Sequence, residues 1–241
     1  MAVAAMGFVL NPDLDAGALA AKFARDGRVQ VKDFLARESA EALHLLLRER
    51  SDWVQVLNVA DKVYELSRET RAQMSEAARA DLDNAIYAQA RQGFQYRYES
   101  IRVPDAAAAR AVSSDSLAAF AEWMSGGEAR DLLRKVVGAA DIAFADAQGT
   151  AYSPGDFLTG HDDAVAGKNR HAAYVFGLTP VWRTEWGGLL LIHEPELGGF
   201  VPAFNTLNLF RVPQMHSVSE VTRAAAFRRY SITGWLRSGE R

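Results

Sequence analysis

Halfway along the chain the residue pattern changes from mainly helical to mainly extended, and this change limits the possible folds more than any other feature. Before about residue 140, apolar residues recur at helical spacing over long segments. After it, short apolar runs are separated by glycine and proline. Short strands joined by such turns are typical of a sandwich or jelly roll. The sequence therefore predicts an α+β chain in which helices from the first half buttress a β-rich second half.

End signals and periodicity divide each half further. Asn11 followed by Pro12 predicts a helix start, because these residues favour the N-cap and the first helical position. One long helix is expected at 69–91, and an alanine-rich helical region at 104–137 with a break at 125–127. Strands are expected at 28–31, 53–59, 63–66, 94–101, 141–146, 172–178, 188–193, 207–210 and 229–236, and around residue 152.

Composition bounds the class of protein. The chain has 241 residues, 49% of them hydrophobic, which is enough for one domain spanning 1–241 with a supporting half at 1–145 and a core at 146–241. A net charge of −3 without charge blocks gives no sign of nucleic-acid binding. The absence of cysteine excludes disulfides and thiol nucleophiles. With no apolar window of about 18 residues, we expect a cytoplasmic protein that binds neither membrane nor nucleic acid.

Three polar residues in the second half of the chain are candidates for chemistry: His161, Asp163 and, further along, His216. On an extended strand His161 and Asp163 project to one face, while Asp162 turns away. Such a pair can share a metal ion, although a hydrogen-bonded surface pair has the same pattern. His216 adds a second imidazole downstream; the alternative is a core or loop histidine. A strand that starts near Arg229 then carries an arginine toward the core.

At these residues the chain resembles the prolyl-4-hydroxylase-like branch of the Fe(II)- and 2-oxoglutarate-dependent dioxygenases. The resemblance covers roughly residues 150–237. It lies in five segments that occur in the family's order: Tyr152 to Asp163, Trp186 to Leu191, Asn205 to Phe210, His216-Ser-Val, and Arg229-Tyr-Ser-Ile-Thr-Gly-Trp. The resemblance implies a double-stranded β-helix, or jelly-roll, core with catalytic function.

The resemblance also implies the ligands of a metal and a cosubstrate. By the family's pattern, His161, Asp163 and His216 bind Fe(II). The family's anchoring arginine stands directly before Tyr-Ser-Ile, which selects Arg229 rather than Arg228 to hold the distal carboxylate of 2-oxoglutarate. The planar guanidinium suits a carboxylate because it offers two parallel hydrogen bonds.

Other positions carry smaller parts of the implied site. Ser231 shares a strand face with the anchoring arginine and could donate a hydroxyl to the same carboxylate. Tyr152 is a further cosubstrate contact or else a core aromatic. Arg170 is our candidate for substrate contact, or else a solvent-exposed residue at a strand start. Gly177 departs from the family, which has tyrosine there, and is expected to leave space for water or for a group from another strand.

The implied activity is hydroxylation of a C–H bond, with release of succinate and carbon dioxide and with ascorbate as a supporting reductant. Resemblance favours a prolyl residue in a protein or peptide, and the face formed by Phe94, Tyr96 and Tyr98 could line its groove. A free amino acid or other small molecule is the alternative substrate. A zinc hydrolase and a non-catalytic 2-oxoglutarate sensor are alternatives of another class, although the hydrolase has no use for a buried arginine.

Overall fold

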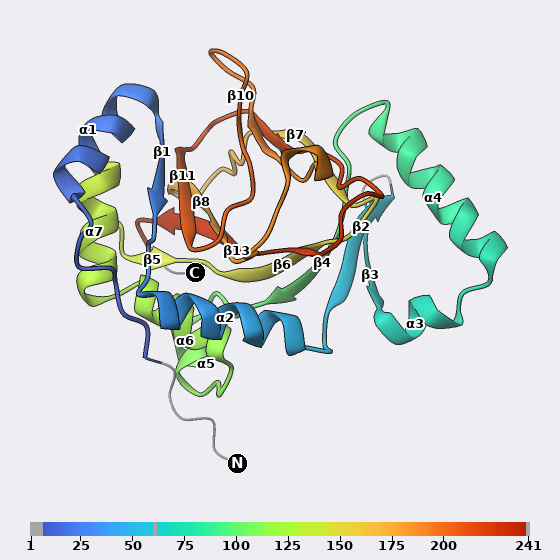
Figure 1. Cartoon of the computed structure of the whole chain (residues 1–241), viewed down its shortest axis with the longest axis horizontal. Helices are drawn as coiled ribbons and strands as arrows, with labels where there is room; N and C mark the ends of the chain where they lie inside the picture. Colours follow the sequence, from blue (N-terminus) through green and yellow to red (C-terminus); the bar gives the residue numbers. More distant parts are fainter. Residues whose placement is uncertain (1–6, 60–61, 240–241) are drawn as a thin grey trace.

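A curved sheet occupies the centre of the structure, a computed structural model that describes residues 7–59 and 62–239 (Figure 1). Helices α1 and α7 cover its left side in this view, and α2, α5 and α6 run beneath it. Helices α3 and α4 stand apart on the right, beside β2 and β3. The helices of the first half thus support the sheet from outside and leave its concave side open.

The described strands form one antiparallel sheet that curls on itself. Their order is β1-β11-β8-β13-β6-β4-β7-β12-β9-β10, with β2 and β3 continuing from β4, and β5 pairing with β13. This arrangement confirms the predicted α+β class with a jelly-roll core. The strands are β1 (Arg28–Lys32), β2 (Val54–Val59), β3 (Lys62–Ser67), β4 (Tyr96–Arg102), β5 (Phe144–Ala145), β6 (Gln148–Tyr152), β7 (Phe157–His161), β8 (Arg170–Gly177), β9 (Leu190–Ile192), β10 (Gly198–Phe200), β11 (Thr206–Arg211), β12 (His216–Val218) and β13 (Arg229–Arg237).

The first helix begins later than predicted. Helix α1 spans Ala16–Asp26, and the carboxylate of Asp15 caps it by accepting the backbone N–H groups of Gly17 and Ala18. Asn11 instead accepts the backbone N–H of Asp13 in a turn. The predicted start at Asn11-Pro12 was therefore wrong, because an Asx turn has the same residue signature as a helix cap.

The long helix predicted at 69–91 is two helices in the structure. Helix α3 spans Arg68–Gln73 and α4 spans Glu76–Ala90. The hydroxyl of Ser75 accepts the backbone N–H of Ala78, so Ser75 caps α4 and ends the continuous helical path. The break turns α3 back toward β2 and β4.

The remaining helices cover the outer face of the sheet. They are α2 (Arg37–Glu49), α5 (Ala107–Ala111), α6 (Ser116–Met124) and α7 (Gly127–Val137). The predicted break at 125–127 is confirmed, and Asp115 adds a second break by capping α6. Phe120 of α6 and Phe176 of β8 stack at the centre of this core, with ring centroids 5.9 Å apart. Among the described residues, no helix is long and apolar enough to cross a membrane.

Candidate functional site

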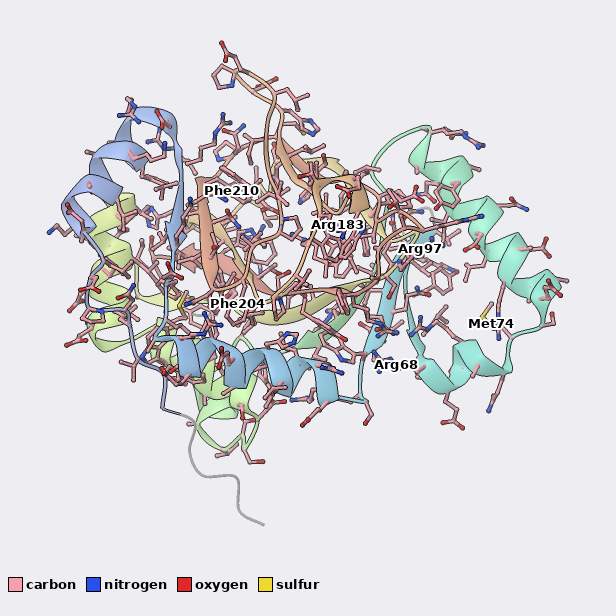
Figure 2. The ribbon with its side chains drawn as sticks, in the orientation of Figure 1. Arg68, Met74, Arg97, Arg183, Phe204 and Phe210 are labelled. Carbon is pink, nitrogen blue, oxygen red and sulfur yellow. The ribbon has the colours of Figure 1, made fainter. Side chains whose placement is uncertain are left out.

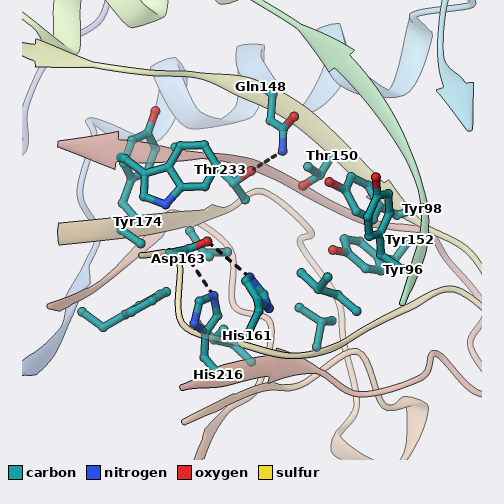
Figure 3. A pocket seen from close by; sticks show the side chains of 18 of the residues that line it. Tyr96, Tyr98, Gln148, Thr150, Tyr152, His161, Asp163, Tyr174, His216 and Thr233 are labelled. Atoms are coloured by element: carbon teal, nitrogen blue, oxygen red, sulfur yellow. Dashed lines mark hydrogen bonds and ion pairs between the residues drawn. The ribbon is translucent and has the colours of Figure 1, made fainter. Parts of the chain in front are cut away.

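Two strand ends bring His161, Asp163 and His216 together inside the curled sheet. His161 ends β7 and lies directly opposite His216 at the start of β12. Asp163 follows with a left-handed φ of 62°, which turns its carboxylate back toward both imidazoles. Its Oδ1 lies 3.4 Å from Nε2 of His161, and its Oδ2 lies 3.4 Å from Nε2 of His216 (Figure 3). The three residues could hold a metal ion, since their ligand atoms all lie within 4.8 Å of one another.

Backbone carbonyls orient both imidazoles toward this point. Nδ1 of His161 lies 3.0 Å from the carbonyl oxygen of Thr159, and Nδ1 of His216 lies 2.7 Å from that of Gln214. When each Nδ1–H donates to its carbonyl, the lone pair of Nε2 is free for a metal. Two imidazoles and one carboxylate are the ligand set of non-heme iron(II) oxygenases, which leaves coordination positions open. The donor set therefore fits Fe(II).

The three groups also shift one another's titration. Burial lowers the pKa of His216 to about 4, and the neighbouring His161 adds to this effect. For His161, burial is outweighed by the hydrogen bond and charge of Asp163, so its pKa is raised. Burial likewise opposes the charge of Asp163, but its two histidine neighbours lower its pKa. Asp162 turns away and accepts the backbone N–H of Ala164.

An arginine without a carboxylate partner lies in the same cavity. The cavity has a volume of about 250 Å³, and Arg229 lines it together with the three candidate metal ligands. The Arg229 side chain is buried, and its guanidinium carbon lies 4.9 Å from the centre of the Tyr152 ring. Among the described residues, no carboxylate pairs with this guanidinium and nothing bonds its Nε. Because an unpaired buried charge is costly, the cavity is suited to an anion.

The neighbouring Arg228 has a different environment. Its Nη1 donates to Oε2 of Glu99 at 2.7 Å on the outer side of the sheet. Arg228 already has a carboxylate there, whereas Arg229 faces the cavity. The placement of these two side chains favours Arg229 as the anion-binding residue.

Hydroxyl groups lie beside the arginine, in an arrangement that the sequence did not predict fully. Tyr152 lines the cavity, and burial raises the pKa of its hydroxyl, which stays a hydrogen-bond donor. Ser231 does not line the cavity; its hydroxyl lies 2.8 Å from that of Thr150, which does. Thr150 was missed because only the register of β6 against β13 places it opposite Ser231. Thr233 also lines the cavity, as expected from its shared strand face with Arg229, whereas Gln148 opposite it was missed for the same reason as Thr150.

Arg170 lies at the back of the metal-ligand loop. Its Nη1 donates to the backbone carbonyl of Asp163 at 2.8 Å, and its guanidinium stacks 3.6 Å from the centre of the Trp235 ring. Trp235 lines the cavity, whereas Arg170 is not among the lining residues. These contacts tie Arg170 to the left-handed turn at Asp163.

The space at Gly177 is occupied by a group from another segment, one of the two expected occupants. A Cβ atom at this position would overlap the backbone carbonyl of Ala203, from the segment between β10 and β11. Gly177 thus permits a close approach of two backbones. Tyr174, on the same strand, lines the cavity, but its hydroxyl donates to the carbonyl of Asp146.

Aromatic side chains form one wall of the cavity. Tyr96 and Tyr98 of β4 and the preceding Phe94 line it, as their predicted common face indicated. Tyr98 stacks on Tyr152 with centroids 5.1 Å apart, and Phe94 lies 5.4 Å from the ring of His161. The Phe94 side chain is exposed, so this wall runs from the buried arginine to the solvent.

Comparison with known proteins agrees with this geometry. Residues 147–237 match the model of the 2OG-Fe(II) oxygenase superfamily. A Pseudomonas putida prolyl-4-hydroxylase is 18% identical with a TM-score of 0.59, over 92% of this chain and 98% of its own. A 2OG-Fe(II) oxygenase family oxidoreductase from Burkholderia pseudomallei is 14% identical with a TM-score of 0.64, over 99% and 97%.

A third similar structure was determined with a peptide. It is a Trichoplax adhaerens prolyl hydroxylase in complex with a hypoxia inducible factor oxygen degradation domain fragment. It is 13% identical with a TM-score of 0.58, over 92% of this chain and 89% of its own. Comparison with curated proteins gives no match. The family match and the shared fold support a 2-oxoglutarate-dependent dioxygenase.

Proposed function

We propose, from the premise that this chain is a 2-oxoglutarate-dependent dioxygenase, that it hydroxylates a prolyl residue in a protein or peptide. In this proposal His161, Asp163 and His216 hold Fe(II), and Arg229 holds the distal carboxylate of 2-oxoglutarate. The observation that carries the proposal is the buried Arg229 guanidinium, which shares one cavity with a two-histidine, one-carboxylate cluster and has no carboxylate of its own among the described residues.

The protein's part in the reaction is to bind, orient and exclude water. When bound, the iron and cosubstrate would supply oxidation by dioxygen: one of its oxygen atoms would enter the substrate and the other the succinate formed as 2-oxoglutarate loses carbon dioxide. Arg229 fixes the end of the cosubstrate far from the metal, and the hydroxyls of Thr150 and Tyr152 lie on the same wall. The stacked Tyr98 and Tyr152 rings give the cavity an apolar wall beside the arginine.

We assign Arg170 a positioning role. By donating to the carbonyl of Asp163, it holds the left-handed turn that aims the carboxylate at both histidines. Its stacking on Trp235 fixes the guanidinium in turn. A long substrate could also contact Arg170, because its guanidinium bonds the Asp163 carbonyl through one nitrogen only.

The aromatic wall supports a prolyl substrate. Pyrrolidine rings are compact and largely apolar, and they pack well on exposed aromatic faces such as Phe94 beside Tyr96. Two of the similar structures are prolyl hydroxylases, one of them with a bound peptide. A free amino acid or other small molecule is the alternative, since loops change substrate on a constant core.

The test measures succinate formed from 2-oxoglutarate with Fe(II), ascorbate and oxygen, before any substrate is added. Wild type is expected to show slow uncoupled turnover that His216→Ala and Arg229→Ala lose. Arg228→Ala is the matched control and should keep it. Binding of 2-oxoglutarate without turnover, even with candidate substrates, would instead indicate a sensor.

The substrate is tested separately by mass spectrometry of host proteins with and without the active protein. A gain of one oxygen atom on proline supports the proposal, and if the modified proteins are cytoplasmic it also supports the cytoplasmic location that we propose. Turnover stimulated by free amino acids, with unmodified host proteins, would move the assignment to small molecules.

A further inference from the structure

A second cavity lies on the opposite side of β4 from the catalytic cavity. Successive residues of β4 alternate between the two: Tyr96 and Tyr98 line the first, and Arg97 lines the second. The second cavity has a volume of about 520 Å³, opens to solvent, and is lined by residues of β2, α3, α4 and β4 together with Arg228. Figure 2 shows Arg68, Arg97 and Met74 in this region, between the sheet and the two outlying helices. Nothing in the proposed reaction uses this space.

Three arginines of this cavity converge on one buried carboxylate. Arg68 and Arg228 each donate to Oε2 of Glu99 at 2.7 Å, and Arg71 bonds to Oε1. The Glu99 side chain is only 2% exposed. One carboxylate thus faces three guanidinium groups, which leaves two positive charges unbalanced. Within the described part of the chain, Nε of Arg71 is buried without a hydrogen-bond partner.

Two further arginines, together with the carboxylates bonded to them, leave this positive surplus unchanged. Arg97 bonds to Asp83 at 2.5 Å and to Asp156 at 3.2 Å. Arg79 donates to the backbone carbonyl of Ala72. Five arginines therefore face three bonded carboxylates. This surplus of two positive charges would be balanced by one phosphate monoester, which carries a charge of about −1.5 to −2 at neutral pH.

We propose that this second cavity binds the phosphate group of a small phosphate monoester. Guanidinium groups match phosphate oxygens with paired hydrogen bonds. The cavity volume lies within the range of small-molecule sites, roughly 300–1,000 Å³. Ala72, Met74 and Leu82 supply an apolar wall for the rest of the ligand. The site requires neither iron nor 2-oxoglutarate, so it is independent of the proposed reaction.

The test is calorimetric titration of the full chain with glycerol 3-phosphate, with glycerate and glycerol as the carboxylate and neutral analogues. We expect a dissociation constant below roughly 1 mM for the phosphate at low salt, and binding at least about tenfold weaker for glycerate. Weakening by added salt is expected for an arginine site. Equal affinity for glycerate would contradict a phosphate site, and the absence of heat with the phosphate would remove the proposal.

Gln55→Glu is the decisive variant. Gln55 lines the cavity and lies directly opposite Glu99 on the neighbouring strand. A second carboxylate there occupies the surplus guanidinium groups without removing any existing bond, so the chain should fold and lose glycerol 3-phosphate binding. Gln92→Glu, at an exposed position beyond α4, is the matched control and should bind normally.

A final variant separates the two cavities. Arg229→Met removes the free guanidinium of the catalytic cavity and should leave glycerol 3-phosphate binding unchanged. If binding disappears in Arg229→Met and persists in Gln55→Glu, the phosphate occupies the catalytic cavity and our assignment is wrong.

Discussion

Replacing Arg229 by methionine should stabilise the ligand-free protein and abolish its response to 2-oxoglutarate. Arg229 is 3% exposed as a residue, and its guanidinium lacks a carboxylate partner among the described residues. Desolvation of such a charge costs several kcal/mol, and contact with the Tyr152 ring offsets about 2 kcal/mol of it. Methionine fills a similar volume without charge, so we expect a gain of about 1–3 kcal/mol in the free energy of unfolding.

When 2-oxoglutarate is bound, wild type should become more stable than Arg229→Met. At a 2-oxoglutarate concentration about 100 times the dissociation constant, wild type gains about 2.7 kcal/mol by mass action, and Arg229→Met gains nothing. Urea unfolding with and without Mn(II) and 2-oxoglutarate measures both effects. A ligand-free Arg229→Met protein that is less stable than wild type would refute the reasoning, because it would mean that the guanidinium is already compensated.

Arg228→Met is the matched control for this experiment. Arg228 donates to Glu99, so its loss removes a favourable partner from a buried carboxylate. Two arginines remain on Glu99, and we expect a destabilisation of about 0.5–1.5 kcal/mol. Stabilisation by 2-oxoglutarate should persist, because the Arg229 side chain is untouched.

Three further predictions concern other residues. Asp163→Gly should lose Mn(II) binding in calorimetry yet keep its fold, whereas Asp163→Ala should also lose about 1 kcal/mol in urea unfolding, because alanine is strained at a φ of 62°. The bonded arginines lower the folded-state pKa of Glu99 below 4.5 despite its burial. Its contribution to stability is therefore present above pH 4.5 and lost as the pH falls through the folded value, and Glu99→Gln should flatten the stability curve in that acid range. In Gly177→Ala the new methyl group should overlap the Ala203 carbonyl and lower the free energy of unfolding by about 1–3 kcal/mol. An unchanged midpoint of urea unfolding would show that the segment around Ala203 can move.

The fold class followed from local pattern, and the errors arose where two structures share one local signal. Alternation and turn residues indicated the longer strands of the β-rich half, because a half-buried strand imposes its period on the sequence; the three-residue strand β10 was not predicted. Asn11-Pro12 was misread because a turn and a helix cap use the same side-chain bond. The break at Ser75 was missed because serine is tolerated within a helix and acts as a cap only when the chain bends there.

The candidate site, too, was predictable from local sequence only in part. His161 and Asp163 are two residues apart, so their proximity could be predicted, but the left-handed turn at Asp163, and not strand alternation, aims the carboxylate at the imidazole. Thr150 and Ala203 come from distant segments, and only strand register and loop packing bring them to Ser231 and Gly177. No local pattern encodes that register.

Strand alternation also explains how two anion-binding cavities can lie back to back. Arg228 and Arg229 are adjacent, and so are Tyr98 and Glu99, yet each pair is divided between opposite sides of the sheet. On the inner side one guanidinium has no described carboxylate, whereas on the outer side three guanidinium groups share one. The strand separates the two sets of guanidinium groups, so each cavity has its own charge balance. For this reason Gln55→Glu and Arg229→Met must each be tested against both ligands, since only independent responses identify two separate sites.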